Sequence, residues 1–253
     1  MEILVCIKQV PDEGVGVKLD LETKEPRIGH IRPLGNSFDR DALEMAVQFV
    51  EAHGGSVTVL TAGDVKDGTC LVDALAVGAT EAYRVDVDTA SMDGSQVADA
   101  LRQGILQLET LHKAPFDLIL CGRESTDLIG TQISGILAKK LCRPFAADLI
   151  AIDPELRQKT PDGYYVLECP KPLVGTMMKP NGYTPRYPTM MDQMKARRHE
   201  IPLLNYTDET TEKVTHLEYF LPPMKEKGIL IEEKNADDTI AKAMQELHRA
   251  KIM

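Results

Sequence analysis

The sequence predicts an open three-layer α/β sandwich, in which a mostly parallel sheet carries helices on both faces. Within residues 1–150, short apolar and β-branched runs alternate with longer segments whose apolar residues recur every three or four positions. The joins are mostly short, and each parallel crossover needs a helix to return the chain. An alternation of this kind is typical of α/β domains.

Four strands are predicted in this half of the chain. Residues 2–10 form an apolar run, and residues 56–61 (SVTVLT) are β-branched. Residues 81–87 (EAYRVDV) and 117–120 (DLIL) complete the series. Because no basic segment precedes the first run, we interpret it as a strand and not as a signal peptide.

Helices are predicted between these strands and after the last one. Residues 39–52 place apolar residues at i, i+3, i+4 and i+7, and residues 66–77 carry a second stripe that ends before Gly78. Two further stripes follow. The four apolar faces consist of Leu43, Ala46, Val47 and Val50; of Leu71, Val72, Leu75 and Ala76; of Val97, Leu101, Ile105 and Leu108; and of Ile133, Ile136, Leu137 and Leu141.

The alternation ends near residue 150. Residues 154–191 are rich in Pro, Gly and Tyr, and we expect their pieces 164–169 and 173–178 to be antiparallel additions to the sheet edge. We assign residues 1–200 to a single domain that includes this edge.

Residues 201–253 are predicted to form an arm that ends in a helix. Residues 205–235 have no clear period and many charges, whereas residues 237–250 are amphipathic. An arm of this kind usually docks on another chain, so we expect a partner subunit.

Composition and charge exclude several classes of protein. The 253 residues carry a formal net charge of −10, which leaves no broad positive surface for sequence-independent nucleic-acid binding. No apolar run reaches the roughly 18 residues of a transmembrane helix, so direct membrane insertion is not expected. The five cysteines and six histidines are scattered and predict neither a disulfide framework nor a metal site. We expect a cytoplasmic protein.

A ligand site is predicted at one edge of the sheet. In open parallel sheets, ligands bind outside the carboxyl ends of the strands, where the strand order reverses. The loops that can reach this edge are residues 8–14, 33–39, 62–67 and 122–132.

The last of these loops is the most informative. Gly122 lets the backbone approach a ligand, and the hydroxyl and N–H groups ahead of the next helix can bind a phosphate. The alternative is that Ser125, Thr126 or Asp127 only caps that helix. The chain contains no GxGxxG, Walker A, GxSxG or HExxH motif, so catalysis by this chain alone is not predicted.

Five segments of the chain carry a family resemblance. They are VCIKQVPDE (5–13), NSFDRDALE (36–44), ALAVGATEA (74–82), CGRESTD (121–127) with Gln132, and PRYP (185–188) running into MKARR (194–198). In this order they resemble the β subunit of electron transfer flavoproteins, and they cover nearly the whole chain. The resemblance implies an adenine nucleotide alpha hydrolase-like fold.

The resemblance also implies a heterodimer that relays electrons between a flavin-dependent dehydrogenase, of the acyl-CoA type, and a downstream acceptor. The electron transfer flavoprotein alpha subunit carries the redox-active FAD, and the β subunit holds AMP or, in electron-bifurcating relatives, a second FAD. Ile129 stands where both kinds of relative have an acidic residue. The choice between AMP and FAD in this chain therefore stays open.

Carried across residue by residue, the nucleotide site falls on the same strand-end loops that the topology selects. No catalytic or metal-binding residue is assigned. The cofactor-binding residues implied are Cys6, Asn36, Ser37, Phe38, Asp39, Ala62, Gly63, Gly122, Arg123, Glu124, Ser125, Thr126, Asp127, Gly130, Thr131, Gln132 and Ile133.

Two contact regions for partners are implied as well. The family's partner-recognition loop corresponds to residues 187–198, with Met190 where a leucine often anchors in an acyl-CoA dehydrogenase. The alternative is that Met190 and Met191 pack against the chain's own arm. Lys8 and Asp12 would lie near the isoalloxazine of the partner's FAD, where a cation favours the reduced, anionic flavin. The alternative for Asp12, which precedes Glu13, is that it only forms a turn.

A function from another class is also compatible with these observations. The chain could be a stand-alone adenine-nucleotide-binding regulatory module without electron transfer. A monomer whose C-terminal helix packs on its own sheet would distinguish that module from an electron carrier subunit.

Overall fold

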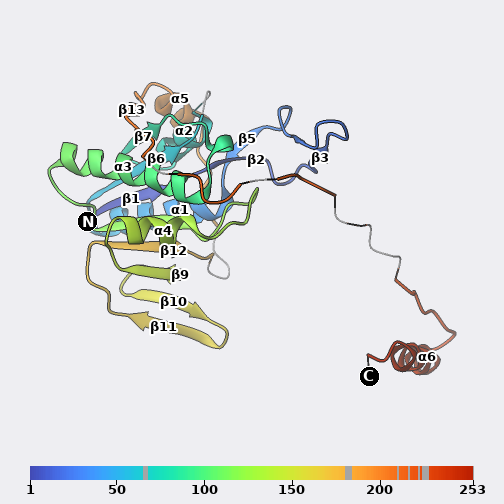
Figure 1. Cartoon of the computed structure of the whole chain (residues 1–253). Helices are drawn as coiled ribbons and strands as arrows, with labels where there is room; N and C mark the ends of the chain where they lie inside the picture. Colours follow the sequence, from blue (N-terminus) through green and yellow to red (C-terminus); the bar gives the residue numbers. More distant parts are fainter. Residues whose placement is uncertain are drawn as a thin grey trace.

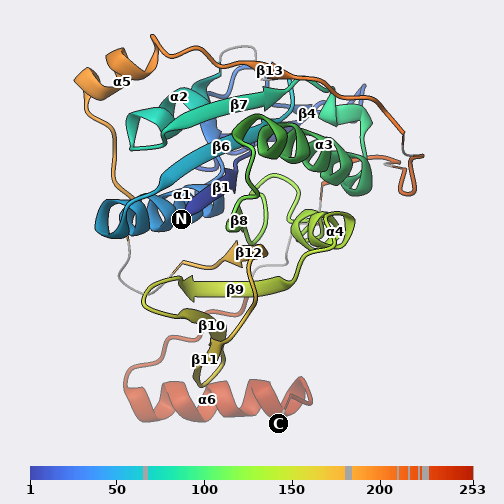
Figure 2. The same ribbon diagram turned by 90° about the vertical axis from the view of Figure 1, so that its left-hand side faces the viewer.

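The computed structural model describes residues 1–64, 68–179, 184–209, 211–215, 217–221, 223 and 228–252. In these residues nine strands form one large sheet (Figure 1). Figure 2 shows helices packed on both sides of it. The predicted three-layer α/β sandwich is confirmed.

The sheet is parallel except at one edge. β1 pairs in parallel with β6 on one side and with β8 on the other. Among the described strands of this sheet, only the pairs β9·β10 and β10·β11 are antiparallel. In spatial order the strands are β11 (Gly163–Leu167), β10 (Leu156–Thr160), β9 (Phe145–Ala151), β12 (Leu173–Met177), β8 (Leu118–Gly122), β1 (Glu2–Cys6), β6 (Ser56–Ala62), β7 (Glu81–Val85) and β13 (Leu203–Leu204).

The expectation for residues 173–178 is wrong. β12 is not an antiparallel edge strand, because it lies inside the sheet between β8 and β9 and is parallel to both. All five of its residues are buried, as a strand covered on both faces requires. The antiparallel addition expected at residues 164–169 is confirmed as β11.

Two pairs of helices cover the sheet. α1 (Ser37–His53) and α2 (Thr69–Ala76) pack on one face, and α3 (Gly94–His112) and α4 (Ile133–Lys140) pack on the other. The expected stripes of α1 and α3 lie on their buried sides. In α2 the buried residues are Cys70, Leu71 and Ala74, so only Leu71 of the expected stripe is buried, and in α4 only Leu137 of the expected stripe is fully buried. The expected start of α2, at residues 66 and 67, lies outside the described residues.

The helix ends follow local chemistry. α1 ends at Gly54, whose φ of 78° suits a residue without a side chain. α3 begins with a capping box, in which Asp93 accepts the N–H groups of Ser95 and Gln96 and the Gln96 side chain accepts the N–H of Asp93.

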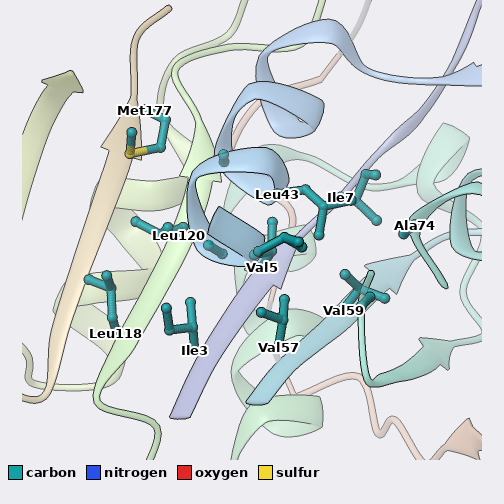
Figure 3. Packing of buried hydrophobic residues seen from close by; sticks show 14 of the residues in the cluster. Ile3, Val5, Ile7, Leu43, Val57, Val59, Ala74, Leu118, Leu120 and Met177 are labelled. Carbon is teal, nitrogen blue, oxygen red and sulfur yellow. The ribbon is translucent and has the colours of Figure 1, made fainter. Parts of the chain in front are cut away.

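Figure 3 shows the core between the sheet and the first helix pair. Ile3 and Val5 on β1 lie beside Val57 and Val59 on β6, and Leu43 of α1 packs over them. Each is at most 2% exposed. Burying one such side chain contributes about 1.5–3 kcal/mol, so this core fixes the position of α1 on the sheet.

Short strands connect the loops at the carboxyl edge of the sheet. β2 (Gln9–Pro11), which follows β1, pairs antiparallel with β5 (Pro33–Gly35), which precedes α1. Between them, β3 (Lys18–Leu19) pairs with β4 (Pro26–Arg27). The pairing of β2 with β5 brings the end of β1 next to the start of α1.

The last part of the chain leaves the domain. α5 (Met190–Ala196) packs on α2, and the chain then adds β13 to β7. α6 (Ala236–Arg249) has no buried residue and stands away from the sheet (Figure 1). Among the helices of the described residues, none is both long and apolar enough to cross a membrane.

Candidate functional site

The strand order reverses between β1 and β8. The chain passes from β1 through β6 to β7 on one side, and then returns through α3 to β8 on the other side of β1. The loops after β1 and β8 therefore diverge at this point, where ligands of open α/β sheets bind. We call the loops after β1, β6 and β8, with the start of α1, the carboxyl rim.

Asp39 joins the parts of the carboxyl rim. Its carboxylate accepts the backbone N–H of Lys8, after β1, and the backbone N–H of Gly122, at the end of β8, both at 2.8 Å. Burial raises the pKa of Asp39 to about 6, although both N–H donors act in the opposite direction. One side chain on α1 thus holds two strand ends.

Gly122 is required by this close approach. A Cβ on Gly122 would lie 2.7 Å from the Asp39 nitrogen and 2.7 Å from the Phe38 carbonyl carbon. These are backbone atoms of α1, so they could yield only by moving the helix. From sequence, Gly122 was expected to let the backbone approach a ligand; the close approach seen in the structure is to α1.

Asn36 connects the same loops a second time. Its side-chain nitrogen donates to the Glu124 carbonyl at 2.8 Å, and its side-chain oxygen accepts the N–H of Thr126 at 3.1 Å. The Asn36 backbone N–H donates to the Lys8 carbonyl at 2.8 Å. With 1% of its surface exposed, Asn36 fixes the first half of the loop after β8.

Lys8 and Asp127 form an ion pair across the carboxyl rim. The Lys8 Nζ lies 2.6 and 2.8 Å from the two Asp127 carboxylate oxygens. The side chains are 31% and 27% exposed, so a ligand can compete for either partner. From sequence, Lys8 was assigned to a flavin environment, and its pairing with Asp127 was not predicted.

The second half of this loop is open. Gly130, Thr131 and Gln132 are exposed, and Ile129 and Thr131 have left-handed φ values of 52° and 48°. α4 begins only at Ile133, with Gln132 as its N-cap and no side-chain capping bond. The N–H groups of its first turn therefore have no capping side chain and can bind an anion.

The helix-capping alternative for this loop is wrong. Ser125, Thr126 and Asp127 lie five or more residues before α4 and do not cap it. The Ser125 carbonyl accepts the N–H of Ile129, which forms a separate turn.

The other predicted site residues lie around this arrangement. Cys6 is buried against Cys121, and the hydrogen bond of its thiol with Cys121, together with burial, raises the pKa of the Cys6 thiol. Ser37 and Phe38 are half-buried in the first turn of α1, and Ala62 and Gly63 end β6 next to β1.

Arg123 and Glu124 follow Gly122 along the loop. The Arg123 backbone N–H donates to the Met177 carbonyl at 3.2 Å. Its guanidinium is 3.8 Å from Glu124 and 3.9 Å from Asp148. These distances are long for ion pairs, so the Arg123 side chain can reorient toward a ligand.

A hollow of about 330 Å³ lies elsewhere, at the amino ends of the strands. Its lining includes Met1, His53, Leu118 and Lys171. Because Leu118 begins β8, the hollow and the carboxyl rim lie at opposite ends of the same strand. It is separate from the candidate site.

A second group of residues lies on the outer side of α1. Arg186 binds the buried Glu44, with its Nε 2.9 Å from one carboxylate oxygen, and binds the exposed Glu51 at 2.6 Å. Burial alone would raise the pKa of Glu44, but the bonds from Arg186 lower it. The Arg40 guanidinium lies over the Tyr187 ring, 5.4 Å from its centroid.

These contacts hold the segment that leads into α5. There, Met190, Met191 and Met194 are 82%, 66% and 61% exposed, whereas Ala196 is buried against the domain. Arg186 was part of the motif quoted from the sequence, but its partners on α1 were not predicted.

Comparison with known proteins identifies the family. Residues 35–209 match the family described as Electron transfer flavoprotein domain. The chain is 31% identical to Electron transfer flavoprotein subunit beta of Megasphaera elsdenii, and the match covers 100% of both chains. The chain belongs to the electron transfer flavoprotein beta subunit family.

Other members of the electron transfer flavoprotein family are similarly related. The chain is 30% identical to Protein FixA of Sinorhizobium fredii over 98% of this chain and 90% of that protein. It is 31% identical to Caffeyl-CoA reductase-Etf complex subunit CarD of Acetobacterium woodii over 82% and 79% of the two chains. The matched residues include Asn36, Asp39, Gly122 and Asp127, whereas Lys8 precedes the matched part of the chain.

Proposed function

We propose that this chain is the β subunit of a heterodimeric electron transfer flavoprotein, which holds an adenine nucleotide at the carboxyl rim. The observation that carries the proposal is the joint at Asp39, in a chain of this family. It organises the switch point between β1 and β8 for a ligand.

The residues of the carboxyl rim fit an adenine nucleotide. The first turn of α4 presents N–H groups without a capping side chain, and Lys8 adds a positive charge; both favour a phosphate. The exposed hydroxyl of Thr131 can donate a further hydrogen bond. Phe38 and Ala62 are half-buried apolar residues suited to contact an adenine ring.

In electron transfer, the part of this chain is to bind the adenine nucleotide and to position the alpha subunit. The Asp39 carboxylate is occupied by two N–H donors and Lys8 is paired with Asp127, so neither is poised to move a proton. When bound, a flavin supplies the ring that accepts and donates electrons. We assign the redox-active FAD to the alpha subunit, with Lys8 and Asp12 on the side that faces it.

The ligand of this chain is an adenine nucleotide, AMP in a simple carrier or a second FAD in a bifurcating one. Both contain the adenosine and phosphate groups for which the carboxyl rim offers partners. Two relatives are named for complexes of CoA-ester reductases, Acryloyl-CoA reductase of Anaerotignum propionicum and Caffeyl-CoA reductase of Acetobacterium woodii. Their names support a partner dehydrogenase of the acyl-CoA type for this chain.

Two regions are available for partners. Residues 201–253 form the arm and helix that we assign to the alpha subunit, and Ile240 on α6 is 61% exposed. The methionines of α5 are assigned to the dehydrogenase. The stand-alone module would need α6 packed on its own sheet, and instead α6 has no buried residue.

Co-expression with the alpha subunit tests the proposal. The purified heterodimer is expected to be yellow, and its flavin absorbance is expected to bleach when an acyl-CoA dehydrogenase and its substrate are added. A colourless heterodimer, or a monodisperse monomer that ignores the alpha subunit, would contradict the proposal.

A further inference from the structure

The arm is attached to the outer surface of α3 by glutamine side chains. The Gln107 amide donates to the Asn205 carbonyl at 2.6 Å and accepts the Asn205 N–H at 3.1 Å. The Gln103 amide donates to the Thr207 carbonyl at 2.8 Å and accepts the Thr207 N–H at 3.1 Å. Each glutamine therefore binds the arm as a neighbouring strand would.

The spacing of the two glutamines matches an extended chain. Residues four apart on a helix are separated by about 6 Å along its axis. The N–H and C=O groups of alternate residues in an extended segment face the same side, about 6.6 Å apart. Gln103 and Gln107 can thus bind residues 205 and 207 only if the arm is extended. Leu204 and Tyr206 alternate with them and pack against the core.

The attachment continues to the beginning of α3. Gln96 reaches Asp208 at 3.5 Å, and the Asp93 carboxylate accepts the N–H groups of Lys213 and Val214 at 2.6 and 3.1 Å. The arm therefore runs antiparallel to α3, from Gln107 to the N-cap residue Asp93.

The end of this path lies beside the candidate site. A Cβ on Gly94, the first residue of α3, would lie 3.8 Å from Ile133, the first residue of α4. Further along the chain, α6 stands away from the sheet (Figure 1). A protein bound by α6 is thus tethered to a point next to the N–H groups assigned to the nucleotide.

We infer that Gln103 and Gln107 are positioning residues for subunit assembly, which hold the arm extended along α3 so that the alpha subunit is captured next to the carboxyl rim. The inference rests on the proposed function, because it takes the alpha subunit as the partner. Its physical basis is preorganisation: an arm already extended loses less conformational entropy when the partner binds. A tethered partner also rebinds at a higher effective concentration.

The double variant Gln103→Ala and Gln107→Ala tests the inference. Both side chains are half-buried, and alanine favours a helix, so α3 is expected to remain folded. Gln103 also donates to the Asp99 carboxylate at 3.0 Å, but Arg102 and Lys140 keep that carboxylate paired in the variant. The matched control is Thr110→Ala, one turn beyond Leu106 on the same helix, because the Thr110 hydroxyl bonds only the Leu106 carbonyl of α3 among its described contacts.

Two measurements on the full-length heterodimer decide whether the inference holds. The first is the rate at which labelled wild-type β chain replaces the β chain of the preformed complex, and the second is hydrogen exchange at the N–H groups of Asn205 and Thr207. The double variant is expected to be replaced about tenfold faster and to exchange these N–H groups faster, with the thermal midpoint of the isolated chain unchanged. Thr110→Ala is expected to behave as wild type.

The outcomes separate this inference from the proposed function. If the wild-type chain does not assemble with the alpha subunit, both are overturned. If the wild-type chain assembles and the double variant is replaced at the same rate, only the inference is overturned. Unchanged hydrogen exchange at Asn205 and Thr207 would also overturn it, because the arm would then be held by other contacts.

Discussion

The Gly122 N–H donates to the Asp39 carboxylate at 2.8 Å, which joins the end of β8 to the first turn of α1. The same carboxylate accepts the N–H of Lys8 after β1. Because β1 and β8 are adjacent strands whose connections leave in opposite directions, this joint holds the switch point together. Its two residues can be tested separately.

Replacing Gly122 with alanine should push α1 away from β8. A Cβ at this position would lie 2.7 Å from backbone atoms of Phe38 and Asp39, and overpacking of this kind costs about 1–3 kcal/mol. Chemical denaturation should show that loss, and the affinity for adenine nucleotides should fall. Gly135→Ala is the control, because nothing lies within 4 Å of its Cβ and alanine favours the helix. Equal stability of the two variants would show that the contact yields easily.

Asp39 should make stability depend on pH. Its pKa in the folded chain is about 6, above the unfolded value of 3.8, so the folded state binds the proton more tightly between these values. The free energy of unfolding should therefore fall by roughly 2 kcal/mol as pH rises from about 4 to about 6, out of a total of roughly 3 kcal/mol for the full titration. Urea titrations of wild type and Asp39→Asn across this range isolate the contribution. Parallel pH profiles of the two proteins would contradict it.

Much of this architecture could be predicted from the spacing of apolar residues along the sequence. The apolar faces of α1 and α3 and the strands β1, β6, β7 and β8 appear where the pattern places them. β12 does not, because a short buried run looks the same whether it lies at an edge or inside the sheet. The position of β12 in the sheet depends on its pairing with β8 and β9, and no local sequence pattern encodes that pairing.

The carboxyl rim was predictable as a place but not as a set of contacts. Topology indicated which loops meet there, and the resemblance supplied residue names. Asp39 and Gly122 are 83 positions apart in the chain, so nothing local relates them. Asn36 likewise has a structural role that composition does not reveal, since it connects two loops from a buried position.

Lys8 and Asp127 should affect nucleotide affinity in opposite directions. Their ion pair is partly exposed, so Lys8→Met should change stability by less than about 1 kcal/mol. Lys8→Met removes a cation near the phosphate, whereas Asp127→Asn releases that cation from its partner. Calorimetric titration with AMP and FAD should therefore show weaker binding for the first variant and tighter binding for the second, each by about fivefold. Changes in the same direction would exclude a phosphate next to Lys8.

Arg186 should be more important for stability than its exposed partner. Arg186→Ala leaves Glu44 buried without its counter-ion, and breaking a buried pair costs about 3–5 kcal/mol, less here because the Arg186 side chain is 36% exposed. Glu51→Gln removes only the outer pair, at an exposed position worth about 1 kcal/mol or less. Thermal unfolding should separate the two variants clearly. A similar loss in both would mean that Glu44 does not need the arginine.

The nucleotide content of the purified heterodimer tests the central claim most directly. The nucleotides released by heat should be identified by mass and quantified against each chain. We predict an adenine nucleotide, AMP or FAD, in addition to the FAD of the alpha subunit, and we predict that Gly122→Ala reduces it while Gly135→Ala does not. Finding only the FAD of the alpha subunit in the wild-type complex would contradict the account.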